Sequence, residues 1–366
     1  MQNIIRTTRR LAVLAGVAFV ALACQVPTDL PIWNTVWQVP ADSSEVTVAS
    51  LLPSSVGIVQ INGTTAFSFS LPQATTSTTL GESCYACASS AGMRIPKPAF
   101  TLADSATVEL PVDVVNADII DGAIDYSLAN GFSFDPLNPG AGAHGWIRIL
   151  VTSGSTLIAR DSIDGRDLSL PNGAYTYKTI NFLASPAAPI RLHGPVTLVA
   201  TLFSPDGDST TINTSEQFSV SASARDILIS QVSVNVPTTT FNPQHGTVDL
   251  SGLDATTAGK IVGGAVILGI HNPFAVGGSL SLDFKAPNGA HVAKSLTLGV
   301  GGPGTPVSTI RVGLSESEIN SLIGQKDVAI TITSSVSSPN GAVVVTPLER
   351  MAITTLVEAT IVTGGN

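Results

Sequence analysis

The chain has 366 residues, 44% hydrophobic and only 12% charged, with many glycines (33) and prolines (23), a mixture that favours turn-rich β structure. This length allows two or three domains with cores of their own, and the apolar content excludes a disordered chain, which could not offset the entropy of ordering. The formal net charge of −9 and the lack of a lysine- and arginine-rich cluster make nucleic acid and anionic headgroups poor partners.

The first 23 residues have the layout of an export signal. Arg6, Arg9 and Arg10 precede an uncharged and mostly apolar stretch, residues 11–23, which is too short to span a bilayer. Removal of residues 1–23 takes away three basic and no acidic residues, so the mature chain has 14 basic and 26 acidic residues and a formal charge of −12. The protein is therefore expected to be exported.

Cys24 directly follows this stretch in the sequence Val20-Ala-Leu-Ala-Cys24. These residues resemble the lipobox of bacterial lipoprotein precursors, although that family prefers leucine where Ala21 stands. The resemblance implies that Cys24 is acylated and anchors the protein to a membrane, and Gln25 at the next position would favour the outer membrane or cell surface. The alternative is ordinary cleavage after Ala23, which leaves Cys24 as a free thiol.

Residues 24–45 are expected to form a lipid tether and lead-in, because several prolines favour an extended path. Trp33 and Trp37 are four residues apart, which places both indoles on one face of an extended strand. They are expected to cover one end of the first domain, and contact with carbohydrate or with a membrane is the alternative. Together with Trp146 they are the candidate ligand-contact residues.

Residues 46–99 are expected to form an N-terminal β extension with a polar loop that contains Cys84-Tyr-Ala-Cys87. With Cys24 acylated, Cys84 and Cys87 are the two remaining thiols, and in an oxidising envelope they are expected to form a disulfide. A thioredoxin-like redox pair would need a strand before it and a helix after it, and neither is indicated. A zinc site would need further thiolates or clustered histidines, whereas the five histidines are scattered singly.

One strand-like segment is present twice. Ile119–Asn130 and Ile261–Asn272, offset by 142 residues, share an early glycine, alternating apolar residues and a final asparagine. Such alternation is typical of a half-buried strand. Further matches, such as Ser204–Gly207 with Ser338–Gly341, have an offset of 134. Because the offset changes once, in a loop rich in glycine and proline, the pattern indicates duplication.

The sequence thus predicts an all-β protein with two tandem sandwiches of Ig-like architecture, residues 100–236 and 244–364, joined by a linker at 237–243. In the second copy, Pro287-Asn-Gly289 between alternating runs predicts a hairpin. The capping box Ser315-Glu-Ser-Glu318 predicts a short helix that ends at Gly324 and covers one end of the second sandwich.

The strand that ends in His271-Asn-Pro-Phe274 is similar to the Asn-Pro signature of the WHy family of late-embryogenesis-abundant proteins. The resemblance implies small β-sandwich domains linked to stress or to contacts at membranes, with an interaction or protective role and no active residue. The first copy departs from this signature, because it has Asn130-Gly131.

No sequence motif brings catalytic residues together. The sequence contains neither a Gly-x-Ser-x-Gly elbow nor a His-Glu-x-x-His zinc motif. Gly299–Gly304 has the spacing of a dinucleotide loop, but Pro303 and a strand-like run replace the helix that phosphate binding needs. Asp161, Asp164 and Asp167 could hold calcium, although short acidic turns are more often simply solvated.

These observations predict a non-enzymatic envelope lipoprotein that binds or scaffolds a protein or glycan of the cell envelope, without a cofactor or metal. One alternative is a polysaccharide-binding or adhesive protein that uses Trp33, Trp37 and Trp146. Another is a hydrolase with its site between the two copies.

Overall fold

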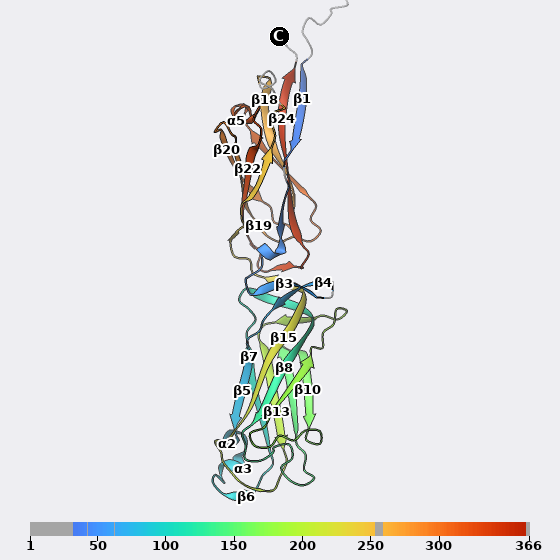
Figure 1. The fold of residues 1–366 in the computed structure, drawn as a ribbon, viewed down its shortest axis with the longest axis vertical. Coiled ribbons are helices and arrows are strands. Elements are labelled where there is room, and N and C mark those ends of the chain that lie inside the picture. Colours follow the sequence, from blue (N-terminus) through green and yellow to red (C-terminus); the bar gives the residue numbers. More distant parts are fainter. Residues whose placement is uncertain (1–31, 42, 62, 253–258, 364–366) are drawn as a thin grey trace, which may run out of the picture.

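Two antiparallel β-sandwiches are stacked end to end in one elongated molecule (Figure 1). The structure is a computed structural model, which describes residues 32–41, 43–61, 63–252 and 259–363. The all-β fold predicted from the sequence is confirmed. The predicted export signal and Cys24 lie outside the described residues.

The first sandwich has two layers, with strand orders β10-β9-β13-β7 and β11-β8-β15-β5. Apolar residues alternate along these strands with polar ones, so each layer has one buried face, as the period of a strand requires. The bounds are β5 Ala74–Thr79, β7 Phe100–Val108, β8 Val114–Asn130, β9 Trp146–Ser153, β10 Thr156–Asp164, β11 Tyr175–Asn181, β13 Val196–Ser204 and β15 Gln217–Val234.

The second sandwich repeats this arrangement, with strand orders β20-β19-β22-β17 and β21-β18-β24-β1. Two short strands, β2 and β16, extend the edges on β24 and β22. The bounds are β1 Trp33–Pro40, β2 Ser44–Thr47, β16 Thr239–Thr240, β17 Gln244–Val248, β18 Ile261–His271, β19 Gly277–Lys285, β20 His291–Leu298, β21 Ser308–Leu314, β22 Val328–Ser337 and β24 Arg350–Thr363.

The two copies match strand for strand: β8 through β11 correspond in order to β18 through β21, β13 to β22 and β15 to β24. The repeated segment therefore occupies equivalent strands, with Ile124 of β8 and Val266 of β18 both buried in the centre of a layer. The loop that follows the repeated strand is longer in the first copy, 131–145 against 272–276, which is where the offset changes. This agreement in topology supports duplication of one module.

The N-terminal strands correct two expectations. β1 pairs with β24 along its whole length, from Trp33 opposite Thr363 to Pro40 opposite Leu356. Residues 33–47 thus complete the second sandwich, so they are not a tether, and the two indoles lie on the second sandwich instead of the first. β5 completes the first sandwich, so residues 46–99 are not a separate extension. Each N-terminal strand satisfies the backbone groups of an edge that would otherwise be open.

The junction between the sandwiches is packed and shares strands from both copies. The last residues of β15, Val232–Val234, pair with β23 (Val343–Val345) of the second copy. The hairpin of β3 (Val56–Ile61) and β4 (Thr64–Phe69) pairs with the same strand, with Phe67 opposite Ile229. These contacts place one continuous buried core through both sandwiches.

The segment expected as a linker, 237–243, is part of this packing. Within it, Thr239–Thr240 pairs with β22, Phe241 is buried, and the Phe241 N–H donates to the Ser334 carbonyl at 2.9 Å. The connection is therefore held at several points and does not behave as a free tether.

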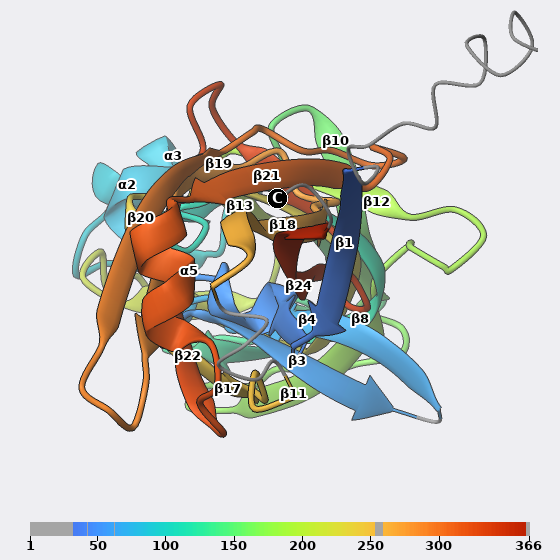
Figure 2. The ribbon, with the colours of Figure 1, turned by 90° about the horizontal axis from the view of Figure 1, so that it is seen from above.

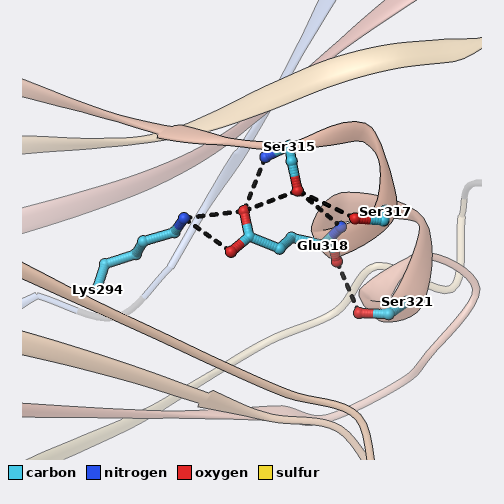
Figure 3. Close-up of polar contacts among 5 residues, drawn as sticks. All are labelled: Lys294, Ser315, Ser317, Glu318 and Ser321. Carbon is cyan, nitrogen blue, oxygen red and sulfur yellow. Dashed lines mark hydrogen bonds and ion pairs between the residues drawn. The ribbon is translucent and has the colours of Figure 1, made fainter.

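The predicted helix is α5 (Glu316–Leu322), which buries Ile319 and Leu322 against the second sandwich. Figure 3 shows its start, where the Ser315 hydroxyl accepts from the Glu318 N–H at 3.3 Å and the Glu318 carboxylate accepts from the Ser315 N–H at 2.8 Å. Lys294 of β20 donates to both carboxylate oxygens of Glu318 at 2.8 Å. This polar cluster closes one end of the sandwich.

Short elements complete the opposite end and an edge of the first sandwich, and η1 follows β2 of the second sandwich. α2 and α3 lie at the end of the molecule farthest from β1 (Figure 1). The short elements are η1 Val48–Ser50, α2 Leu80–Ser83, α3 Tyr85–Ala88, β6 Arg94–Pro96, β12 Ile190–His193 and β14 Ser209–Thr211.

Candidate binding surface

The three tryptophans predicted to contact a ligand do not meet. Trp33 and Trp37 lie on β1 of the second sandwich, where 64% and 44% of their surfaces are exposed. Trp146 begins β9 of the first sandwich, with its ring 6.0 Å from that of Phe203 and beneath the guanidinium of Arg148. The set therefore cannot form one binding site.

Cys84 and Cys87 form a disulfide in the structure and are buried, at 2% and 0% exposure. The sequence indicated neither a strand nor a helix beside them, which is wrong: β5 ends at Thr79, and α2 and α3 follow. Thr79 and Glu82 form a capping box that starts α2. Because a redox-active pair must expose a sulfur to its partner thiol, the burial favours a structural role.

The asparagines that close the repeated strands have matching structural roles. The Asn130 amide donates to the Phe134 and Leu170 carbonyls at 2.9 and 2.8 Å, and its oxygen accepts from the Phe132 N–H at 2.9 Å. In the second copy, the Asn272 amide donates to the Val276 carbonyl at 2.9 Å, and its oxygen accepts from the Phe274 N–H at 3.2 Å. The asparagine in the Asn-Pro signature is thus a buried turn cap.

The acidic loop and the histidines have other partners. Asp161 accepts from the Tyr126 hydroxyl at 2.5 Å and lies 3.9 Å from Lys178. Within the described residues, no group of three or more His, Cys, Asp or Glu side chains could hold a metal ion. Histidine rings form hydrogen bonds with Asn138, Thr331 and Asp283.

The most extensive arrangement of polar side chains lies on the outer face of the layer formed by β11, β8, β15 and β5. Alternation brings these side chains to one face, because the residues between them on the two central strands, β8 and β15, are buried. We call this surface the hydroxyl face. It consists of Tyr175, Tyr177, Thr179, Asp125, Ser127, Ser219, Ser221, Ser223, Thr75 and Ser77.

Two tyrosines border the hydroxyl face on its edge strand. Tyr175 and Tyr177 of β11 expose 69% and 79% of their surfaces. Because they are two residues apart in one strand, their rings project on the same side, with Cα atoms roughly 7 Å apart. Next to them lies a shallow depression of about 530 Å³, lined by residues that include Tyr177, Ser127, Ser221 and Arg225.

The charged groups in the depression are fixed by their neighbours. Asp125 accepts from the Thr179 hydroxyl at 2.6 Å and forms an ion pair with Arg225, whose Nε lies 3.3 Å from its carboxylate. The Ser221 hydroxyl contacts the Thr75 hydroxyl at 3.0 Å and the Gln73 amide. Side chains held in this way lose little freedom when a ligand binds.

The hydroxyl face combines exposed aromatic rings with many donors and acceptors and one carboxylate–guanidinium pair. Aromatic rings offer apolar contact to the C–H faces of sugars, while hydroxyl, carboxylate and guanidinium groups match sugar hydroxyls. Sequence reasoning missed this surface. The alternation Tyr175-Thr-Tyr-Lys-Thr179 indicates a strand with both rings on one face, but it does not reveal that β8 and β15 place polar groups beside them.

A second depression, of about 620 Å³, lies on the outer face of the other layer and is lined by Arg148, Leu150, Leu157, Arg160, Asp161 and Ser162. No tyrosine lines it, so Arg160 provides a control position for experiments on the hydroxyl face.

No helix in the described part of the chain is both long and apolar enough to cross a membrane.

The sequence matches no family model and no curated protein. Among solved structures, a secreted protein of Parabacteroides distasonis is similar over 88% of this chain and 99% of its own, with 10% identity and a TM-score of 0.27. The tandem CBM22 domains of Paenibacillus barcinonensis Xyn10C match over 91% and 94%, with 9% identity and a TM-score of 0.19. Likeness at this level assigns neither a family nor an activity.

Proposed function

We propose that this chain is an exported, lipid-anchored binding protein of the cell envelope, without catalytic activity, which presents the hydroxyl face to a partner. The observation that carries the proposal is this preorganised polar surface with two exposed tyrosines. The elongated shape of the molecule also supports the proposal (Figure 1). Trp33, at the start of β1, follows the predicted acyl site Cys24 by nine residues. The second sandwich, which contains β1, therefore lies between the predicted anchor and the first sandwich, which carries the hydroxyl face.

Binding on this surface needs no movement of the backbone. The hydroxyl face is built on strands paired on both sides, apart from the edge strands, and its charged pair is already formed. A rigid surface pays little ordering entropy, so even a modest set of contacts yields measurable affinity. This arrangement supports a scaffold that holds a partner at a distance from the membrane.

An extended polysaccharide is the partner class that the tyrosines favour. Tyr175 and Tyr177 replace the three tryptophans as the candidate aromatic contacts, since the tryptophans lie on different sandwiches. Adjacent rings on one strand can contact consecutive units of a sugar chain, while Asp125 and Arg225 bind hydroxyl groups beside them.

A glycan array probed with the mature chain tests this proposal. We expect binding to envelope polysaccharides, and a loss of roughly tenfold or more in affinity on Tyr175→Ala/Tyr177→Ala. Tyr85→Ala is the matched control, because Tyr85 on α3 is 91% exposed and is not part of the hydroxyl face. An array without signal, or equal losses for both variants, would refute polysaccharide binding at this surface.

Photo-crosslinking in intact cells tests the wider binding role. A photoreactive residue at position 177 should give adducts that are absent with the same residue at position 160, which lies on the other layer. Equal adducts from both positions would show that the hydroxyl face has no preferred partner.

Mass spectrometry of the protein isolated from its native cells tests the anchor and the disulfide. We expect a mature N-terminus at Cys24 with the mass of attached acyl chains. The peptide with Cys84 and Cys87 should have the mass of the oxidised pair. An unmodified Cys24 would contradict the anchor, and a peptide alkylated without prior reduction would contradict the disulfide.

A further inference from the structure

We infer that the exposed end of β1, with Ile32, Trp33, Val36 and Trp37, is a membrane-contacting tip that seats the second sandwich on the lipid surface. The inference deepens the proposed function and rests on its lipid anchor. It assigns a partner of defined chemistry, the interface between headgroups and acyl chains, to these residues.

The tip is the apolar edge of an uncharged strand. β1 pairs with β24 on one side and forms the edge of its layer. Ile32, Trp33, Val36 and Trp37 expose 68%, 64%, 52% and 44% of their surfaces. An exposed apolar edge strand in a soluble protein is a liability unless something covers it.

The pairing register shows how the tip continues the core outward. Trp33 and Trp37 lie opposite Thr363 and Ala359, so both indoles share the face of β24 that carries buried Ala359 and Ile361. The view along the long axis shows β1 at the rim, on the side away from α5 and β20 (Figure 2). The two indoles therefore continue the apolar inner face of the β24 layer at its edge, where they are exposed to solvent.

The charge of the tip also favours a lipid interface over an electrostatic contact. None of the residues in Trp33–Pro40 is charged, and the paired segment Leu356–Thr363 contains one charged residue, Glu358, although the mature chain has a formal charge of −12. The nearest acid, Glu358, is buried and paired with Gln38 and Arg311. An acidic protein gains nothing from anionic headgroups, whereas tryptophan partitions into the interface through its amphipathic ring.

The position of the anchor makes this contact accessible. Trp33 is nine residues after Cys24, so even a fully extended connection keeps the tip within roughly 30 Å of the acylated residue. The strand also begins at the end of the molecule opposite α2 and α3 (Figure 1). Contact at the tip would hold the first sandwich away from the membrane.

Tryptophan fluorescence on anchored protein tests the inference, because the chain has three tryptophans and Trp146 serves as an internal control. The mature chain is coupled through Cys24 to vesicles of phosphatidylethanolamine, phosphatidylglycerol and a maleimide lipid, with or without brominated acyl chains. Trp146→Phe leaves only the tip indoles, and Trp33→Phe/Trp37→Phe leaves only Trp146.

We expect the emission of Trp146→Phe to shift to shorter wavelength on the vesicles and to be quenched by brominated chains, while that of Trp33→Phe/Trp37→Phe is unchanged. Unquenched tip indoles on anchored protein would overturn the inference. Equal quenching of Trp146 would also overturn it, because the molecule would then lie along the surface. A shift that depends on protein concentration without lipid would assign the tip to a second copy instead.

The maleimide lipid supplies the anchor in this experiment. Its outcome is therefore independent of whether cells acylate Cys24, which the mass of the native N-terminus decides separately.

Discussion

Asn130 and Asn272 show how one buried residue fixes the same turn in both copies. Each is almost fully buried, at 2% and 5% exposure, and binds backbone groups of the loop that follows its strand. The next residue differs, Gly131 in one copy and Pro273 in the other, so the shared requirement is the asparagine. The phenylalanine two residues after each asparagine, Phe132 or Phe274, is fully buried.

Replacement of either asparagine should therefore destabilise its sandwich. Asn130→Ala leaves the Phe134 and Leu170 carbonyls and the Phe132 N–H without this partner, which should cost about 2–4 kcal/mol of unfolding free energy. Urea unfolding of this variant, and of Asn272→Ala, measures the effect. Losses no greater than that of the exposed control Asn288→Ala would contradict the assigned role.

Lys97 is a second buried residue, and its lowered pKa should make the stability of the protein depend on pH. It is 1% exposed, its ammonium donates to the Pro98 carbonyl at 2.8 Å, and it lies 4.7 Å from the centre of the Phe100 ring. Burial lowers the pKa of Lys97 to about 8 from an ordinary value of 10.5, although Asp206 opposes the change. The folded state thus releases this proton at lower pH than the unfolded state does.

The unfolding free energy should consequently rise with pH between about 8 and 10.5, because the unfolded chain binds more protons in that window. Urea unfolding at pH 8 and pH 10 should show a higher unfolding free energy at pH 10 for the natural chain, and no such increase for Lys97→Met. Lys285→Met, at an exposed lysine of β19, is the control and should keep the gain. The same gain in Lys97→Met would contradict this account.

At the scale of elements, sequence patterns within a segment predicted those strands and helices that depend mainly on the residues of that segment. Alternating apolar residues indicated β8, β18, β19 and β22, and the capping box indicated α5. Thr79 and Glu82 carry the same type of signal for α2, but a single helical turn has no periodicity to support it. The repeated segment indicated two sandwiches because equivalent strands need equivalent patterns.

Pairings between distant residues could not be predicted in this way. Trp33 and Thr363 are opposite each other in β1 and β24, yet no local pattern selects that partner for β1. The hydroxyl face has the same limitation, since its residues come from four strands spread over residues 74–234. The partner of an edge strand such as β1 depends on which sheet edge remains unpaired once the other strands have folded. That is a property of the whole sheet and not of the local sequence.

The start of α5 supports a prediction at this scale. Two hydrogen bonds from Lys294, with the Ser315 N–H, lower the pKa of Glu318 to about 2 from 4.5. A lowered folded-state pKa means that this stabilisation is complete above pH 4.5 and is lost as the pH falls toward 2. Between pH 5 and pH 2.5, Glu318→Gln should lose less stability than the natural chain does.

Thermal unfolding across this range provides the measurement, with Glu316→Gln as the control in the same helical turn. At neutral pH, Ser315→Ala should cost about 1 kcal/mol, because one N–H in the first turn loses its cap. Identical acid profiles for Glu318→Gln and the natural chain would exclude the carboxylate as the source.

At the scale of the whole molecule, the packed junction turns two sandwiches into one elongated body. β15 pairs with β8 of its own sandwich and with β23 of the other copy, and the β3–β4 hairpin pairs with the same strand. Such a junction transmits the orientation of one sandwich to the other. The proposed anchor at the β1 end would therefore set the distance of the hydroxyl face from the membrane.

Energy transfer from the protein to acceptor-labelled lipids tests this arrangement most directly, with the mature chain coupled through Cys24 to vesicles and one donor dye at a time. The dye is attached at position 262, exposed near the β1 end, or at position 166, in the loop after β10 of the first sandwich. A strand of nine residues spans roughly 30 Å, so two stacked sandwiches separate these positions by more than a typical transfer distance. We predict efficient transfer from position 262 and little from position 166; equal transfer from both, or the reverse order, would contradict the account.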